Sequence, residues 1–107
     1  MSAALVGELR SRRTPLSLAS GPGVITVRVQ VAEMWDAIRV TAHPDTALSE
    51  LKRRVVNEFL PGHEYLDDFV LKLRGWEMLD EQQSLKAGGM VDGSIVLLAR
   101  RRRQPVR

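Results

Sequence analysis

The feature that most constrains the fold is a strict alternation of apolar and polar residues that begins near residue 24 and occurs twice. In residues 25–31, isoleucine or valine occupies every second position, and polar residues lie between them. A short turn at residues 32–35 is expected next, and residues 38–42 then show the same alternation. A period of two is typical of strands buried on one face, and two such runs joined by a short loop predict a β-hairpin. The residues expected to point outward are Thr26, Arg28, Gln30, Arg39 and Thr41.

An amphipathic helix is expected directly after this hairpin. Pro44 cannot donate a hydrogen bond to a strand ladder, and Asp45 or Thr46 would suit the N-terminal cap of a helix. Apolar residues then recur at intervals of three and four in residues 47–59, which indicates one buried helical face. The expected buried positions are Leu48, Leu51, Val55 and Phe59, and the expected solvated positions are Glu50, Lys52, Arg53, Arg54 and Asn57.

The second half of the chain predicts three further strands. Residues 69–74 form an alternating run, a turn is expected at residues 75–76, and residues 78–79 suit a short strand. Residues 94–99 form the last strand. One helix must then cover one face of a mixed sheet, because neither element can bury its apolar side alone. A chain of 107 residues has room for one such α+β domain.

Four segments of the chain together resemble the ubiquitin family. The hairpin resembles the opening of those proteins, and residues 44–52 resemble their proline, cap and helix start. Residues 71–80 resemble their third strand, glycine turn and short fourth strand, and residues 84–85 with residues 90–98 resemble their closing segment. The resemblance, which extends over residues 24–103, implies a β-grasp fold with a mixed sheet of four to five strands packed on one helix.

The C-terminal end departs from the family pattern. Conjugated members of the family end in Gly-Gly, whose carboxylate is activated, whereas Gln104 and Pro105 occupy these positions here. Proline fixes its φ angle, and its ring occupies a position where conjugated members have a glycine without a side chain. Gly88 with Gly89 lies before the last strand, where cleavage would expose the core. The resemblance therefore implies a non-catalytic interaction module or adaptor, and a ubiquitin-type modifier that requires C-terminal processing is the alternative.

The resemblance also implies where a partner protein would bind. In the family, outward positions of the third and last strands form an apolar patch on which partners dock. Lys72 replaces the central isoleucine of that patch, so a partner that supplies aliphatic contacts and one or two carboxylates would suit this face. The expected partner-binding residues are Val70, Lys72, Arg74, Trp76, Ile95, Leu97 and Ala99, with Trp76 at the rim.

Two interpretations are open for the two tryptophans, Trp35 and Trp76, which both lie at expected turns. Each either folds back to cap one end of the core or projects as an exposed anchor for a partner. The anchor interpretation suits Trp76 better, because this residue borders the expected binding face.

The net charge of +3 is unevenly distributed along the chain. Residues 24–99 hold eight Lys or Arg and twelve Asp or Glu, so the excess of positive charge comes from the two ends. We expect a flexible basic tail at residues 1–23, a domain at residues 24–99 and an arginine-rich tail at residues 100–107. The arginine run is either solvated or a site for an anionic partner such as nucleic acid, and consists of Arg100, Arg101, Arg102 and Arg103.

Catalytic and cofactor chemistry is not expected. The sequence has no cysteine, and its two histidines, His43 and His63, are far apart in expected loops. It has no glycine-rich phosphate loop and no signature of a catalytic triad. We therefore expect a monomer with no enzyme activity, cofactor, metal or membrane span. The expected location is cytoplasmic, or nuclear in a eukaryote, where the arginine run suits an import signal.

Overall fold

The two alternating runs form the predicted hairpin. The computed structural model describes residues 14–62 and 66–101. In it, β2 (Ile25–Val31) pairs antiparallel with β3 (Asp36–Ala42) along its whole length, and the 3-10 helix η1 (Ala32–Met34) joins the two strands. Inward residues such as Val29 and Val40 are fully buried, which confirms the predicted faces of both strands.

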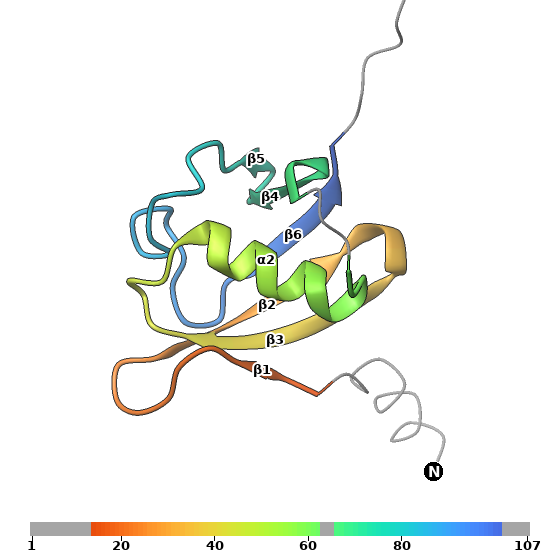
Figure 1. Cartoon of the computed structure of the whole chain (residues 1–107). Coiled ribbons are helices and arrows are strands. Elements are labelled where there is room, and N and C mark those ends of the chain that lie inside the picture. The colour runs from red at the N-terminus through yellow and green to blue at the C-terminus, as the bar shows by residue number, and fades with distance from the viewer. Residues whose placement is uncertain (1–13, 63–65, 102–107) are drawn as a thin grey trace, which may run out of the picture.

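The rest of the sheet is built on both sides of this hairpin. β6 (Ile95–Arg100) lies parallel to β2, β4 (Phe69–Leu73) lies antiparallel to β6, and β5 (Trp76–Glu77) lies antiparallel to β4. On the other side, β1 (Leu16–Ser17) pairs with β3 (Figure 1). The strand order is β1-β3-β2-β6-β4-β5, so the predicted α+β β-grasp fold is confirmed with a sheet of six strands.

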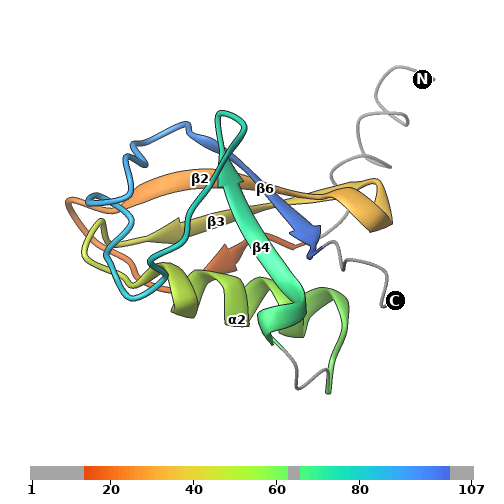
Figure 2. The same ribbon diagram turned by 90° about the horizontal axis from the view of Figure 1, so that it is seen from above.

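The helix α2 (Leu48–Phe59) crosses one face of this sheet (Figure 2). Its four expected apolar positions are at most 6% exposed and pack with the inward residues of the strands. The expected side-chain cap is wrong, because Ala47 is the N-cap residue and makes no side-chain cap bond. Instead, the N–H groups of Leu48 and Ser49 donate to the carbonyl oxygens of Gln83 and Glu81 at 2.9 and 2.8 Å. The first turn of α2 is therefore satisfied by a segment distant in sequence.

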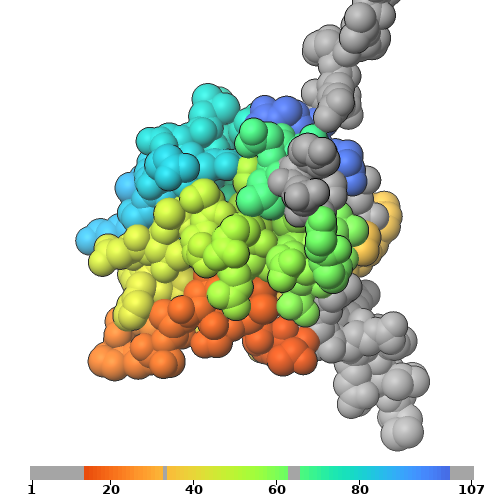
Figure 3. Space-filling view, in the orientation of Figure 1, coloured from red at the N-terminus to blue at the C-terminus, as the bar shows by residue number. Residues whose placement is uncertain are grey.

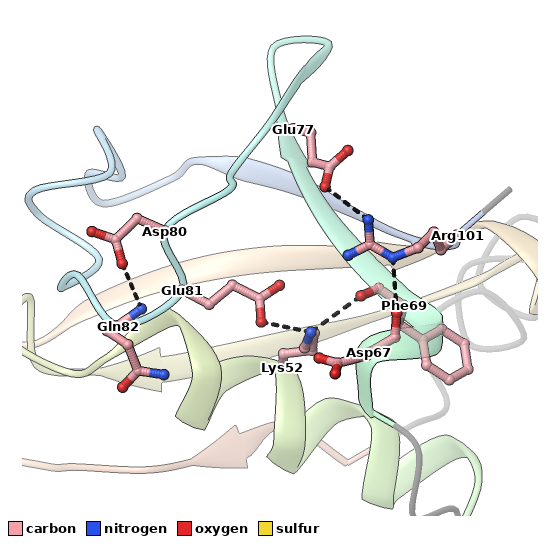
Figure 4. A network of polar contacts seen from close by, with 8 residues as sticks. All are labelled: Lys52, Asp67, Phe69, Glu77, Asp80, Glu81, Gln82 and Arg101. Atoms are coloured by element: carbon pink, nitrogen blue, oxygen red, sulfur yellow. Dashed lines mark hydrogen bonds and ion pairs between the residues drawn. The ribbon is translucent and has the colours of Figure 1, made fainter. Parts of the chain in front are cut away.

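Lys52 corrects the predicted polar face of α2. It was expected in solvent, but it is 2% exposed. Its Nζ donates to the carbonyl oxygen of Phe69 at 3.1 Å and lies 2.6 Å from Oε1 of Glu81 (Figure 4). Lys52 flanks the apolar face of α2, where β4 and the segment after β5 cover it. The buried ammonium group is tolerated because it is both paired and hydrogen-bonded.

The folded domain extends beyond the predicted boundaries at residues 24 and 99. Leu16 and Leu18 pack against the core, so these residues are not part of a free tail. Residues 21–23, Gly-Pro-Gly, form a turn in which Gly21 and Gly23 have φ angles of 97° and 86°. At the other end, Arg100 still pairs with Phe69. The remaining parts of the expected tails, residues 1–13 and 102–107, lie outside the described residues.

The turn after β4 lies one residue earlier than predicted. Arg74 and Gly75 both have positive φ angles, 55° and 84°, as the tight turns of two-residue hairpins require. Trp76 therefore opens β5, and the predicted strand at residues 78–79 is wrong. Met78 is buried and Leu79 is 82% exposed.

Candidate functional site

The candidate site lies on the face of the sheet opposite α2, which we call the outer face. Residues that lie directly opposite each other on paired strands share a face. The register therefore places Arg39, Arg28 and Ile95 in one row across β3, β2 and β6. The next row crosses β2, β6, β4 and β5 and consists of Gln30, Leu97, Lys72 and Glu77.

An aliphatic stripe runs along β6 in the middle of this face. Ile95 is 55% exposed, and Leu97 and Ala99 are half-buried. Lys72 lies directly opposite Leu97 on the neighbouring strand β4. The structure thus brings together four of the predicted binding residues: Lys72, Ile95, Leu97 and Ala99.

Val70 was expected in this exposed set and is the main correction to it. It lies opposite Ala99, but only 4% of its surface is exposed. The side chain of Arg101 extends from the end of β6 across β4, where Nε donates to the carbonyl oxygen of Asp67 at 2.9 Å and Nη1 lies 3.5 Å from Oε2 of Glu77 (Figure 4). Because it is buried, Val70 offers no surface to a partner. The alternation of residues did not predict this burial, since it does not reveal a side chain that crosses a strand.

The structure adds Arg28 and Arg39 to the candidate site. These two arginines lie directly opposite each other on β2 and β3, and Arg28 also lies opposite Ile95. Like charges in this arrangement repel, which disfavours the folded state. The sequence predicted that both residues point outward, but only the strand register shows that Arg28 adjoins the aliphatic stripe and that Arg39 lies on the far side of Arg28.

The cations around the stripe have no acidic partner within residues 14–62 and 66–101. They are Arg28, Arg39 and Lys72. Arg74, which was predicted on this face, lies in the turn after β4 and lines a hollow beside Trp76 instead. Glu77 is the acidic residue of the second row, and it is paired with Arg101. The outer face therefore presents aliphatic surface flanked by positive charge on both sides.

Trp76 is exposed, but it does not border the outer face. It lies opposite Leu73, whose side chain packs toward the core on the α2 side of the sheet. With 78% of its surface exposed, Trp76 lines a hollow of about 330 Å³ together with Leu73, Met78 and Gly88. The predicted placement of Trp76 at the rim of the binding face is therefore wrong.

Trp35 lies at the opposite end of the sheet from Trp76. It follows η1, at the end where β2 and β6 finish and β4 begins, and it is 95% exposed. Neither tryptophan caps the core, so the capping interpretation is wrong for both. The structure does not combine them into one surface.

The arginine run is partly integrated into the fold. Arg100 belongs to β6, and its guanidinium carbon lies 5.0 Å from the ring centre of Phe69. The backbone N–H of Arg101 also donates to the carbonyl oxygen of Asp68. Arg100 and Arg101 are therefore held by the domain, whereas Arg102 and Arg103 lie outside the described residues.

The titratable residues in the described part of the chain are not arranged as metal ligands. No group of three or more His, Asp or Glu residues is placed to hold a metal ion there. His43 is exposed, and His63 lies outside the described residues. The pKa of Arg53 is raised by its hydrogen bonds to Glu50, whose carboxylate also attracts it, but this pair lies on the solvent side of α2.

None of the helices in residues 14–62 and 66–101 is long and apolar enough to cross a membrane.

Comparison with known proteins identifies the fold. No protein family and no curated protein sequence matches the chain. Among solved structures, a ubiquitin from Caldiarchaeum subterraneum matches with a TM-score of 0.62 and 18% identity, over 78% of this chain and 100% of that one. The ubiquitin-like domain of Plasmodium falciparum Dsk2 matches with a TM-score of 0.61 and 23% identity, over 73% of this chain and 99% of that one. A de novo design based on ubiquitin matches with a TM-score of 0.63 and 18% identity, over 81% of this chain and 100% of that one. The chain therefore has the ubiquitin-like β-grasp fold.

Proposed function

We propose that this protein is a non-catalytic ubiquitin-like interaction module that binds a partner protein through its outer face. The binding residues are the stripe Ile95, Leu97 and Ala99 together with Lys72, and the arginines Arg28 and Arg39 extend the site. Val70 and Trp76 are excluded, because one is buried and the other faces the opposite side of the sheet.

The observation that carries this proposal is the combination of an exposed aliphatic stripe with unpaired cations on either side of it. Exposed aliphatic residues that cluster on one surface are typical of interaction sites. Cations without partners lose little when a partner covers them, provided that the partner brings carboxylates. The partner would therefore present an apolar ridge to β6 and acidic residues to Arg28 and Lys72.

Neighbouring structures are consistent with this role at the level of the fold. One of them is described as the ubiquitin-like domain of Plasmodium falciparum Dsk2. Because a fold does not determine a partner, the outer face of this chain is what supports the proposed role.

Site-specific crosslinking in native cells tests the proposal. A photoreactive residue at Ile95 should capture a partner, and one at Val91 should not, although both positions are similarly exposed, at 55% and 59%. With the crosslinker placed at Gln30 instead, Ile95→Asp should abolish capture of the partner. The matched substitution Val91→Asp should preserve it. Equal capture from both positions would contradict the proposal.

The alternatives predict different results in the same cells. A conjugated modifier would show covalently shifted forms of higher mass, which the interaction module lacks. Binding through the arginine tail would survive Ile95→Asp, disappear on truncation after Arg101, and weaken steeply as salt is raised.

A further inference from the structure

Trp35 is held in a position that local preferences oppose. It is the C-cap residue of η1 and has φ and ψ angles of 52° and 37°, in the left-handed region that favours glycine. Its indole is also almost fully exposed, at 95%. Departures of this kind from local preference cluster at functional positions. Glycine would suit this turn better, so the indole has a role other than closing the turn.

The residues on either side of Trp35 give this end of the hairpin its chemistry. Met34 is a further exposed apolar side chain, and Asp36 brings a negative charge directly after the indole. We call these three residues, Met34, Trp35 and Asp36, the hairpin tip. It projects an aromatic side chain beside a thioether and a carboxylate.

The hollow beside Trp76 has the size and the lining to receive such a side chain. Its volume is about 330 Å³, and Leu73, Trp76 and Met78 form its apolar walls. Binding sites for small molecules hold about 300–1,000 Å³, so a hollow at the lower limit suits one large side chain rather than a helix. A Cβ atom on Gly88 would lie 2.6 Å from Cε of Met78, so the wall that contains Gly88 is packed closely on the core. The hollow is therefore formed before anything enters it.

The charge at the hollow is opposite to that of the hairpin tip. Arg74 lines the hollow and has no acidic partner within residues 14–62 and 66–101. Glu77 lines it too, but its carboxylate is paired with Arg101. A segment that carries a carboxylate beside its aromatic residue, as Asp36 does beside Trp35, would complement this lining.

The hairpin tip and the hollow lie at opposite ends of the sheet. Trp35 lies beyond Val31, which is opposite Leu98, whereas the turn into β5 follows Leu73, which is opposite Val96. In the space-filling view the gold end of the hairpin and the cyan segment after β5 lie on opposite sides of the molecule (Figure 3). Trp35 therefore cannot enter the hollow of its own molecule, but it can enter that of a second copy.

We propose that this protein associates with itself head to tail, with Trp35 of one copy inserted into the hollow beside Trp76 of the next. The two indoles pack against each other, and Asp36 lies near Arg74 of the neighbouring copy. Each copy has one tip and one hollow, so the contact is heterologous and produces a ring or a filament rather than a two-fold dimer. An interface built around one inserted side chain is small, so the association is weak and depends on concentration. The contact departs from the monomer expected from the sequence, and it does not depend on the outer face.

Two variants and their mixture test the proposal by sedimentation velocity of the purified full chain. The average mass of the wild type should rise with concentration beyond that of a dimer. Trp35→Ala lacks the inserted side chain and Trp76→Ala lacks one wall of the hollow, so each alone should remain monomeric. Because each variant keeps the half that the other lacks, their equimolar mixture should form dimers and nothing larger.

The control variants separate this contact from other surfaces. Leu79→Ala removes an exposed apolar side chain that lies outside the lining of the hollow, and Ile95→Asp alters the outer face. Both should associate as the wild type does. Should Trp76→Ala not fold, Arg74→Glu takes its place, since it should weaken association at least tenfold and form dimers when mixed with Trp35→Ala.

Three results would overturn the proposal. One is a wild type that stays monomeric at the highest concentration at which it is soluble, and another is a mixture that forms no dimer. The third is dimerisation of either single variant alone, which would indicate a two-fold contact. Loss of association in Leu79→Ala would count against it equally, because the contact would then not depend on a defined hollow.

Discussion

The buried Lys52–Glu81 pair permits a quantitative test of the packing beside α2. The Lys52 side chain is 2% exposed, while the Glu81 side chain is 18% exposed. In Glu81→Gln, the lysine loses its counter-charge but cannot reach solvent. Removal of one partner of a buried ion pair typically costs about 3–5 kcal/mol, and the partial exposure of Glu81 places the expected loss near the lower limit, about 3 kcal/mol.

The complementary substitution should cost less. In Lys52→Met no buried charge is left, Glu81 can hydrate, and an apolar side chain of similar length fills the space. What remains is the carbonyl oxygen of Phe69, which loses the hydrogen bond from Nζ, at a cost of about 1–3 kcal/mol. The double variant Lys52→Met/Glu81→Gln should be close to Lys52→Met alone, because the two effects share one interaction.

Urea unfolding of the three variants and the wild type measures these differences, provided that the slope against urea is unchanged. Glu81→Gln should be less stable than Lys52→Met. The opposite order, or a loss below about 1 kcal/mol for Glu81→Gln, would show that water reaches the ammonium group and that the site is not closed as described.

Further predictions concern the core and the outer face. Leu51→Ala and Leu71→Ala should each lower the free energy of unfolding by about 2–5 kcal/mol in urea titrations, since both side chains are fully buried, and a loss below about 1 kcal/mol would contradict their placement. Leu97→Asp should weaken capture of the partner at least tenfold with little change in melting temperature, whereas Trp76→Ala should leave capture intact, and the reverse result would move the site to the hollow beside Trp76. Lys72→Glu should slow association with an acidic partner and reduce the salt dependence of the rate in stopped-flow measurements, so an unchanged rate would remove Lys72 from the site.

Much of the fold was predictable because its strands and helix each bury one face. The period of two in residues 25–31 and 38–42, and the helical spacing of Leu48, Leu51, Val55 and Phe59, are consequences of that one-sided burial. The same alternation correctly placed Ile95 and Leu97 on the side away from the helix. These inferences require only local geometry, so the sequence alone was sufficient for them.

The sequence did not predict the features that depend on contacts between distant segments. Gln83 and Glu81 satisfy the first turn of α2 in place of a side-chain cap, and Glu81 makes the burial of Lys52 tolerable. No local pattern marks such partners, because their positions are defined only once the chain has folded back on itself.

The candidate site shows the same division. The alternation of residues predicted that Arg28, Arg39, Lys72 and Val70 face away from the helix. It does not predict which strands are neighbours or which side chains cross a strand. The sheet order placed Arg28 beside Ile95, and the side chain of Arg101 crossed β4 where Val70 was expected to be open. The sequence by itself determined which side chains face away from the core, and the tertiary structure decided which of them share a surface, because strand register and side-chain crossings arise from contacts between segments far apart in the chain.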